Sequence, residues 1–408
     1  MHYDMIIIGM GLSGLMAAKT AAEAGQKVLI IGKGMGSLGL FSNTIDLLGV
    51  LPMGMKISDG LSQWMKDHPK HPYSKVGLDR MKEAISSFTS LFPPPYSFEA
   101  ADDDKNFSIL TGAGTFRPTY LIPITLVAGA SLKKGELLIV GFKGFKDFYA
   151  DYVADQLDCE RVSLSVPEAS YHEMTSTSLA RWMEKESFRK IIGGEIKKTL
   201  HNEARVGLPA ILGVRETWKV KKDLEEIIGA GIFEIPILPP SIPGIRVYNR
   251  FKEWLIQRGV SFHLGHPVAK AVLKGKKCQG VDISVPPVAK FFTADRYILA
   301  TGRFIGGGLV ADKDRVFEPI FNLPVAQPGT REEWFGISFF NNRPHPIHQT
   351  GISTNASLRP LNEKGDVLLE NVWISGSILA HHHCVEEKSR EGIEIATGYA
   401  AAKEALSS

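Results

Sequence analysis

Residues 3–34 read YDMIIIGMGLSGLMAAKTAAEAGQKVLIIGKG, and this stretch decides the expected fold. The short apolar run at 5–8 predicts a buried parallel strand. Three glycines follow with G-x-G-x-x-G spacing, and a run rich in Ala, Leu and Met at 12–24 predicts a helix. A second apolar run at 28–31 predicts the next strand. Strand, glycine turn, helix and strand within about 30 residues is the context that makes this motif a dinucleotide-binding turn.

Each glycine of the motif has its own physical role. Gly9 permits the tight turn after the strand, and Gly11 leaves room for backbone amides to approach a pyrophosphate. Gly14 lets the helix pack close to the strand. The helix N-terminus, with Leu12 and Ser13 in its first turn, supplies partial positive charge. The alternative is a glycine turn that only packs a helix on a sheet, and the coincidence of all these parts argues against it.

The end of the second strand departs from the usual pattern. In such domains an Asp or Glu there commonly hydrogen-bonds the adenosine ribose, but this chain has Gly32 and Lys33. Two alternatives remain open: Lys33 reaches a phosphate, or backbone atoms of 32–36 serve the ribose. The departure weakens the case for adenosine more than the case for a flavin.

Composition limits the class of protein. The 408 residues are 44% hydrophobic, which is ordinary for a globular protein. Their formal net charge is only +3, so the sequence shows no strong positive charge of the kind that binds nucleic acid. Cys159, Cys278 and Cys384 stand far apart, so neither a disulfide framework nor a complete set of cluster ligands is expected in this chain. No apolar run reaches the roughly 18 residues typical of a membrane span. We expect a cytoplasmic protein that meets a membrane only through partners.

The pattern changes in the middle of the chain. From 58 to 244 strand and helix patterns alternate again, which predicts a second α/β domain inserted into the first. The proline-rich IPILPPSIPG at 235–244 predicts a stiff connector at its end. The expected division is 1–57 and 245–408 for the two parts of the nucleotide domain, with 58–244 as the insert. The expected fold class is α/β, a Rossmann-like FAD/NAD(P)-binding domain carrying an inserted α/β domain.

Three later segments resemble the ordered fingerprints of two-dinucleotide-type flavoproteins. They read VSFHLGHPVAKAV at 260–272, YILATG at 297–302 and NVWISGS at 371–377, and a closing helix is expected over about 393–406. The resemblance implies, in that order, contacts with an adenine, a pyrophosphate and a ribityl phosphate, with the helix dipole aimed at the flavin pyrimidine.

The same segments predict a flavin, with FAD preferred, FMN as the alternative and an empty site as a third possibility. A plain NAD domain is less favoured because it does not need the last glycine turn and helix. The expected cofactor-binding residues are Gly9, Gly11, Leu12, Ser13, Gly14, Lys33, Ser42, Val268, Thr301, Gly302, Arg303, Gly376, Ser377 and Ile393.

Longer motifs along nearly the whole chain resemble the B subunit of anaerobic glycerol-3-phosphate dehydrogenase. They include GLFSNTIDLLGVLP at 39–52, GTFRPTYLIP at 114–123, FEIPILPPSIPGIRV at 233–247, FIGGGLVADKDRVFEPIFNLPV at 304–325 and GISTNASLRPL at 351–361. The resemblance implies a flavoprotein subunit, traditionally assigned FMN, so the preference for FAD runs against that assignment.

The resemblance also implies partners: a catalytic A-type flavoprotein and an iron–sulfur C-type subunit that passes electrons to the quinone pool, with peripheral attachment to the cytoplasmic membrane through them. Glycerol-3-phosphate is then oxidised to dihydroxyacetone phosphate on this chain or on the A-type partner. The alternative is an electron-transfer or scaffold subunit with no substrate chemistry of its own.

No pair of base and phosphate-binding residue stands out. Arg117 and Arg359 each precede a proline in family-like loops, where a guanidinium can clamp a phosphate, and both are expected to face the flavin pocket. His345 and His348 lie beside prolines in a loop suited to lining the same pocket, and Asp46 is a candidate general base. The alternatives are a salt-bridged arginine, a structural loop and a capping carboxylate.

The stretch AHHHCVEEKSREG at 380–392 departs from the family, which is glycine-rich just before the closing helix. The run HHHC at 381–384 suggests a metal site, but consecutive residues do not easily point at one ion and nothing at ligand spacing supports it. We therefore expect no metal, and a polar loop that faces solvent, the flavin or a partner. The loop is a candidate for part of the contact with the iron–sulfur subunit.

Overall fold

The computed structural model describes residues 2–42, 44–52, 54–130, 132, 136–166, 173–201, 203–283, 290–338 and 344–408. The chain forms two compact units. Unit 1 comprises Met1–Ser37, Val50–Leu91 and Arg250–Ser408, and unit 2 comprises Leu38–Gly49 and Phe92–Asn249. The last boundary falls within α9 (Ile242–Gln257).

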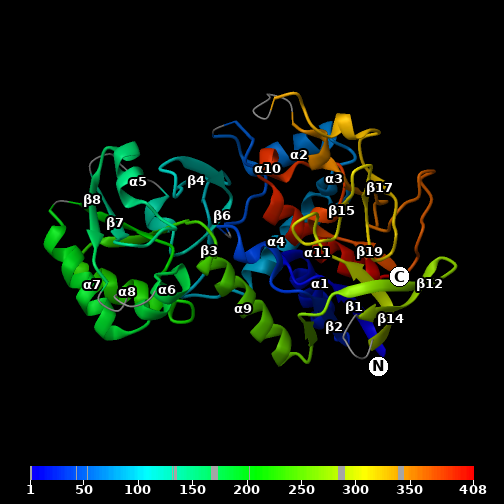
Figure 1. Ribbon diagram of the computed structural model, residues 1–408, viewed down its shortest axis with the longest axis horizontal. Helices are drawn as coiled ribbons and strands as arrows, with labels where there is room; N and C mark the ends of the chain where they lie inside the picture. Colours follow the sequence, from blue (N-terminus) through cyan, green and yellow to red (C-terminus); the bar gives the residue numbers. More distant parts are fainter. Residues whose placement is uncertain are drawn as a thin grey trace. The chain divides into compact units, whose positions relative to one another are not determined.

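Unit 1 is built on a seven-stranded sheet with the order β11-β2-β1-β14-β13-β12, in which β19 also pairs with β14. Strands β11, β2, β1, β14 and β19 are parallel, and β12 and β13 continue the sheet as an antiparallel hairpin. The bounds are β1 (His2–Ile8), β2 (Val28–Gly32), β11 (Ser261–Leu264), β12 (Val268–Lys274), β13 (Lys277–Ile283), β14 (Lys290–Leu299) and β19 (Val372–Ile374). The two sequence-distant parts of the expected nucleotide domain therefore form one sheet (Figure 1).

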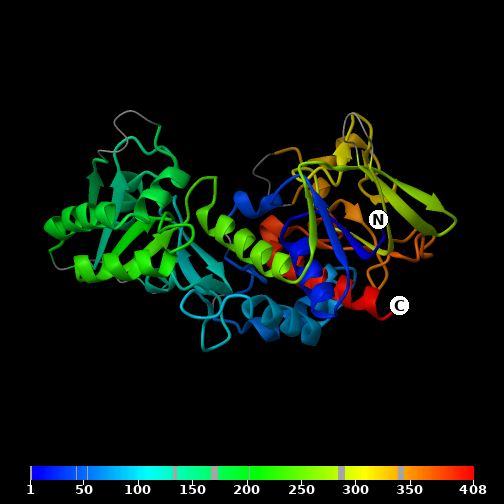
Figure 2. The same cartoon turned by 90° about the horizontal axis from the view of Figure 1, so that it is seen from below.

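Two helices of unit 1 pack closely together, α1 (Leu12–Glu23) from the start of the chain and α11 (Arg390–Leu406) from its end. The approach depends on Gly398, where an added Cβ would lie 2.3 Å from the carbonyl oxygen of Ser13. The shorter helices of this unit are α2 (Ile57–Asp67), α3 (Pro72–Val76), α4 (Leu78–Thr89) and α10 (Cys384–Glu387). Figure 2 shows α1 and α11 side by side from a second direction.

The units divide the chain differently from the boundaries expected at 57/58 and 244/245. Val50–Leu91 belongs to unit 1 because α3 and α4 pack against α11. Leu38–Gly49 belongs to unit 2, where Ile45 forms an antiparallel bridge with Leu121. The expected connector at 235–244 runs into α9, since a proline such as Pro243 is tolerated in the first turn of a helix.

Unit 2 has a parallel sheet of its own with the order β10-β9-β7-β8. Helix α5 lies on one side of it and α7 and α8 on the other (Figure 1), so both faces are covered, as the alternating pattern predicted. The bounds are β7 (Leu137–Phe142), α5 (Ala150–Leu157), β8 (Glu160–Leu164), α6 (Ser176–Met183), α7 (Glu186–Thr199), β9 (Arg205–Pro209), α8 (Thr217–Ile228) and β10 (Gly231–Ile235).

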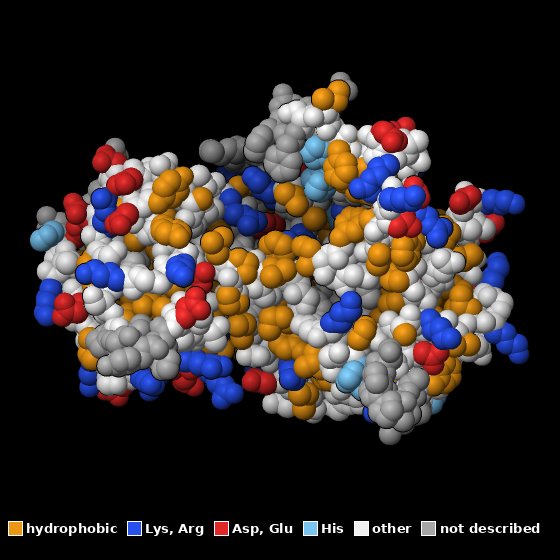
Figure 3. Space-filling model, in the orientation of Figure 1, with side chains coloured by type: hydrophobic (Ala, Val, Ile, Leu, Met, Phe, Trp, Pro, Cys, Tyr) orange, Lys and Arg blue, Asp and Glu red, His pale blue; other side chains and the backbone are white. Residues whose placement is uncertain are grey.

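Short strand pairs complete the two units. Unit 2 has β3 (Phe98–Ala100) with β6 (Leu121–Pro123) and β4 (Phe107–Leu110) with β5 (Phe116–Thr119), and unit 1 has β15 (Val310–Ala311) with β16 (Val316–Phe317) and β17 (Val325–Ala326) with β18 (Gly351–Ile352). Basic and acidic side chains are interspersed on the face drawn in Figure 3, as the small net charge suggests. Among the described residues, no helix combines the length and apolar character needed to cross a membrane.

Candidate functional site

The turn after β1 shows why its three glycines differ. At Gly9, φ is +124° and an added Cβ would lie 2.2 Å from the carbonyl oxygen of Ala300, so only glycine fits. At Gly14 a Cβ would lie 2.1 Å from the carbonyl oxygen of Gly9, which confirms the expected close packing of helix on strand. Around the Cβ position of Gly11, no described atom lies within 4 Å. Packing therefore requires the first and third glycines, and the second one leaves open space.

That open space lies at the N-terminus of α1. The N-cap residue is Gly11, and no described side chain caps the helix. The first intrahelical bond runs from the amide of Leu15 to the carbonyl of Gly11, at 3.0 Å. The amides of the first turn have no intrahelical partner, and with the helix dipole they make this end attractive to a phosphate.

The other expected glycine turns converge on the same helix. An added Cβ at Gly376 would lie 2.8 Å from the Cβ of Ser13, and one at Gly302 would lie 3.5 Å from the hydroxyl of Ser377. The hydroxyl of Thr301 is buried and has no hydrogen-bond partner among the described residues. The structure thus brings the predicted nucleotide-binding turns together in unit 1 and leaves a buried polar atom unpaired beside them, as a site for a phosphate-bearing cofactor requires.

A side chain at Gly32, the last residue of β2, would meet Met10. A Cβ at Gly32 would lie 2.7 Å from Cγ and 3.2 Å from Cβ of Met10, the residue between the first two motif glycines. An Asp or Glu at this position would displace that side chain. The Lys33 ammonium instead reaches the loop after β14, 3.0 Å from the Cβ position of Gly307.

The remaining cofactor candidates of unit 1 are apolar. Leu12 and Ile393 are buried at the start of α1 and in the first turn of α11, and Val268 is buried at the start of β12. Their side chains contribute to packing, so any contact that they make with a cofactor is through the backbone or through an apolar surface.

Three candidates meet in unit 2. The guanidinium of Arg117 forms an ion pair with the carboxylate of Asp46, and one of its nitrogens lies 3.5 Å from the hydroxyl of Ser42. The other carboxylate oxygen of Asp46 accepts from Thr44 at 3.4 Å, and Asp46 is only 2% exposed. These contacts are the ones expected of a structural ion pair. The role of Asp46 as a base and the placement of Arg117 at the flavin pocket stay predictions.

Arg359 and His345 lie in unit 1. The guanidinium of Arg359 lies over the ring of Trp373, 5.1 Å from its centroid, and its Nε is buried without a partner among the described residues. Nδ1 of His345 accepts from the amide of Gly336 at 2.9 Å, which fixes the ring orientation. Both side chains are therefore anchored, as a structural role predicts, and their placement at the flavin pocket stays a prediction.

Of the three surroundings expected for the HHHC stretch, solvent is the one that the burial of its histidines argues against. His382 and His383 are 1% and 7% exposed, and His381 is half-buried. The loop is held down because Glu387 accepts from the amide of His383 at 2.6 Å and contacts Nε2 of His71 at 3.1 Å. In the part of the chain that the structure describes, no group of three or more potential ligands is arranged to hold a metal ion.

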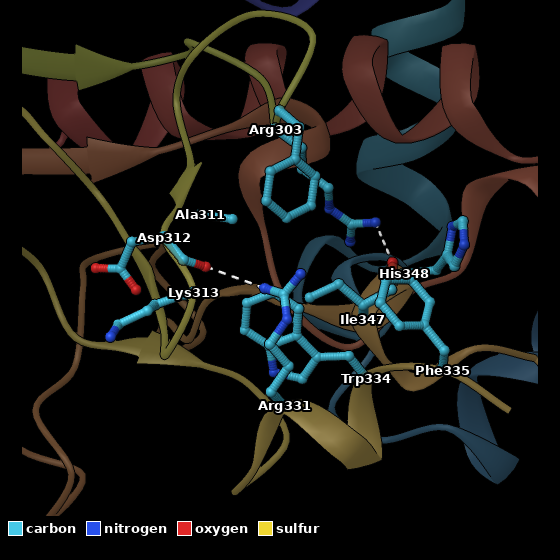
Figure 4. A pocket seen from close by; sticks show the side chains of 10 residues that line it. Arg303, Ala311, Asp312, Lys313, Arg331, Trp334, Phe335, Ile347 and His348 are labelled. Atoms are coloured by element: carbon cyan, nitrogen blue, oxygen red, sulfur yellow. Dashed lines mark hydrogen bonds between the residues drawn. The ribbon is translucent and has the colours of Figure 1, made fainter.

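Arg303 and His348 are brought together by this loop. The guanidinium of Arg303 donates to the carbonyl of His348 (Figure 4). It also donates to the carbonyls of Leu379 and His382, at 3.0 Å each. The His348 ring stacks on His383, with centroids 4.6 Å apart. Burial lowers the pKa of His348, and the nearby His383, His345 and Arg303 lower it further. Its imidazole is therefore neutral at pH 7.

Both residues line a cavity of about 680 Å³ in unit 1 (Figure 4). Its lining comes from the loop after β14, from the loop between β15 and β16, from the 3-10 turn at Arg331–Trp334 and from the turn at Pro346–Gln349. The lining residues are Arg303, Phe304, Ala311, Asp312, Lys313, Arg331, Trp334, Phe335, Ile347 and His348.

A buried acidic group lies near the N-terminus of α11, where the helix dipole was expected to act on a flavin. Burial raises the pKa of Glu394 to about 7, although Arg390 opposes the shift. Its carboxyl group hydrogen-bonds Ser37, and its Cγ lies 3.9 Å from the Cβ position of Gly376. The sequence pattern gave no sign of this residue, because an acidic residue in the first turns of a helix is ordinarily a solvent-exposed one.

The parallel sheet, the converging glycine turns and the uncapped helix define a flavoprotein of the FAD-binding class. Residues 4–389 match the FAD binding domain family, and the chain belongs to it. More narrowly, the chain belongs to the family formed by the B subunits of anaerobic glycerol-3-phosphate dehydrogenase. Both the expected family and the expected fold class are thereby confirmed, and the first match supports FAD over FMN.

The relatives align along nearly their whole length. The probable B subunit of anaerobic glycerol-3-phosphate dehydrogenase from Halobacterium salinarum is 30% identical over 416 residues, which cover 98% of this chain and 96% of the relative. The B subunit of the Vibrio cholerae enzyme is 29% identical over 427 residues, covering 100% and 97%. A flavocytochrome c3 fumarate reductase in its open conformation superposes with a TM-score of 0.48 at 9% identity, covering 100% of this chain and 78% of that one. Because the relatives are named as B subunits, membership of their family implies a complex with other subunits.

Proposed function

We propose that this chain is the flavoprotein B subunit of a glycerol-3-phosphate:quinone oxidoreductase complex. It oxidises glycerol-3-phosphate to dihydroxyacetone phosphate or relays the electrons of that oxidation through its flavin. The observation that carries the proposal is the open space over Gly11 at the uncapped N-terminus of α1, in a chain of the B-subunit family. The amides of that turn would hold the pyrophosphate of FAD, and the unpaired hydroxyl of Thr301 would donate to it.

The oxidation converts a secondary alcohol to a ketone: hydride leaves the carbon, and the hydroxyl proton leaves to a base. FAD, when bound, supplies the two-electron acceptor. His348 is the base that we favour, because its lowered pKa leaves a neutral imidazole at pH 7 and it lines a cavity rich in positive charge. The other cofactor-binding residues expected from the sequence, between Gly9 and Ile393, remain part of this proposal.

We further propose an A-type flavoprotein and an iron–sulfur C-type subunit as partners, with peripheral attachment to the cytoplasmic membrane through them. Support comes from the names of the relatives and from the three scattered cysteines, which cannot supply a cluster. Among the described residues of 380–392, the exposed ones are Val385 and Glu386. Part of the loop is therefore left to contact a partner.

A second candidate function is electron transfer without substrate chemistry. The observation that favours it is the pairing of Asp46 with Arg117, because these two side chains satisfy each other and neither is left free for a substrate.

One assay separates the two functions. The full chain, purified with its flavin, is mixed with glycerol-3-phosphate and an artificial electron acceptor, and the same assay is run on the complex recovered from membranes. Acceptor reduction by the chain alone assigns the oxidation to it. Reduction only by the complex assigns the relay role. Absence of glycerol-3-phosphate oxidation in both would refute the proposed function.

A further inference from the structure

The cavity beside Arg303 carries an excess of positive charge. Three cationic side chains line it, Arg303, Lys313 and Arg331, against a single carboxylate, Asp312. In the described part of the chain, no carboxylate oxygen lies within 4.0 Å of the charged nitrogens of these three cations. The charge is therefore left for a ligand rather than used in ion pairs.

The single carboxylate is committed to its own loop. Oδ1 of Asp312 accepts from the amides of Asp314 and Arg315, both at 2.8 Å. Its second oxygen lies 3.9 Å from Nε of Arg315. Because these contacts hold the carboxylate in the turn, it does little to neutralise the cations across the cavity.

The cations are positioned by neutral groups. Arg331 lies over the ring of Trp334, 4.6 Å from its centroid, and donates to the backbone carbonyl of Asp312 at 3.0 Å (Figure 4). The partners of Arg303 are backbone carbonyls and the His382 ring, and its Nε is buried with no partner among the described residues. Glu387 acts on Arg303 only at longer range. A guanidinium that forms no ion pair retains much of its attraction for an anion.

Part of the cavity lining is apolar. Phe304, Phe335 and Ile347 line the cavity together with the cations, and the two phenylalanines are 41% and 55% exposed. Carbon atoms of a ligand would cover these rings while its anionic group meets the cations. Such a lining suits a small anion that has a carbon skeleton more than it suits a bare inorganic ion.

We propose that this cavity binds a small organic phosphate, a phosphomonoester, with Lys313 and Arg331 contacting the phosphate group and Arg303 supporting the charge from the inner wall. The choice of glycerol-3-phosphate as the ligand rests on the proposed function. The cavity and its positive charge do not depend on the proposed function. Lys313 and Arg331 lie outside the nucleotide-binding turns.

The test is isothermal titration calorimetry on the full chain carrying its flavin, with glycerol-3-phosphate, inorganic phosphate and glycerol as separate probes. Lys313→Gln and Arg331→Gln are compared with the wild type, and each removes one positive charge from an exposed residue of the cavity. Lys364→Gln is the matched control, because it removes one exposed lysine of unit 1 outside the cavity. Flavin absorbance and circular dichroism verify that every variant is folded and loaded.

We expect glycerol-3-phosphate to bind at least about tenfold more tightly than inorganic phosphate, and glycerol not to bind. Each cavity variant should weaken the binding of glycerol-3-phosphate by about 5- to 50-fold, while Lys364→Gln leaves it unchanged. Equal affinity for both phosphates, no binding, or binding unaffected by the two cavity substitutions would overturn the proposal. A protein that carries flavin but shows any of these results defeats the cavity assignment alone, whereas a protein that cannot take up flavin defeats the proposed function.

Discussion

The hydroxyl of Ser13, in the first turn of α1, donates a 2.9 Å hydrogen bond to the hydroxyl of Ser375, just before the last glycine turn. Both side chains are buried, and 362 residues of sequence separate them. This bond fastens the first nucleotide-binding turn to the last one, so the geometry of the two turns is coupled.

Ser13→Ala removes the donor and leaves the buried Ser375 hydroxyl without this partner. We expect a loss of about 1 kcal/mol in the free energy of unfolding and weaker flavin retention, since the two turns are no longer held in register. Urea unfolding followed by circular dichroism measures the first effect, and flavin fluorescence during dialysis measures the second. Unchanged stability and retention would show that the bond has no such coupling role.

Gly11→Val should give a folded protein that has lost its flavin. Among the described residues, no tertiary contact lies within 4 Å of the Cβ position, so the fold tolerates the side chain, but the side chain fills the approach to the amides of α1. Flavin affinity should fall by at least about 100-fold at an unchanged melting temperature. Gly194→Ala is the matched control in unit 2, because its Cβ position is equally free of contacts.

Gly14→Ala gives the converse result. Its Cβ would lie 2.1 Å from the carbonyl oxygen of Gly9, so the helix must move away from the strand. We expect the flavin-free Gly14→Ala protein to melt at a lower temperature than the flavin-free wild type. A Gly14→Ala protein as stable as the wild type would contradict the close packing.

Glu394 gives the apo protein a pH-dependent stability. A glutamate ordinarily ionises near pH 4.5, whereas burial raises the pKa of Glu394 to about 7. Between these pH values the folded state holds a proton that the unfolded state has released. The contribution of Glu394 to the free energy of unfolding therefore falls as pH rises from about 4.5 to about 7 and is constant above that. Glu394→Gln stays neutral throughout. Its melting temperature minus that of the wild type should therefore become more positive between pH 5 and pH 8, and a difference independent of pH would refute the assignment.

The core of unit 2 contains an ion pair whose disruption should be costly. The two terminal nitrogens of the Arg246 guanidinium, Nη1 and Nη2, each donate to the Glu234 carboxylate at 2.7 Å, and both side chains are buried. Glu234→Gln leaves the buried guanidinium without a counter-charge, so we expect a loss of about 3–5 kcal/mol in unfolding free energy. Glu226→Gln, which breaks an exposed pair with Lys222 on α8, should cost less than about 0.5 kcal/mol. Similar losses in the two variants would contradict this difference.

The sequence predicted local elements well because their signals are local. The apolar runs at 5–8 and 28–31 form β1 and β2, as predicted. The compact units of the structure have other boundaries than the expected domains, and the division into domains stays a prediction. Amphipathic helices α2 and α4 have an apolar face, but that face does not reveal which sheet or helix it will cover.

The candidate site was predictable only where a motif specified geometry. Glycine spacing identified the turn at Gly9–Gly14, whereas the pairing of Arg117 with Asp46 joins positions 71 residues apart and has no spacing signal. The contact of Arg303 with His348, the close approach of Met10 to the Cβ position of Gly32 and the burial of Glu394 likewise depend on tertiary packing.

The most direct measurement is the identity of the bound cofactor. The full chain is purified under mild conditions, its absorption spectrum is recorded, and the cofactor released by denaturation is separated by chromatography against FAD and FMN standards. We predict a flavin spectrum and release of FAD in an amount close to one per chain, with none from Gly11→Val. A folded, colourless protein that neither flavin can reconstitute would contradict the flavoprotein assignment, and release of FMN alone would contradict the adenine-binding part of the site.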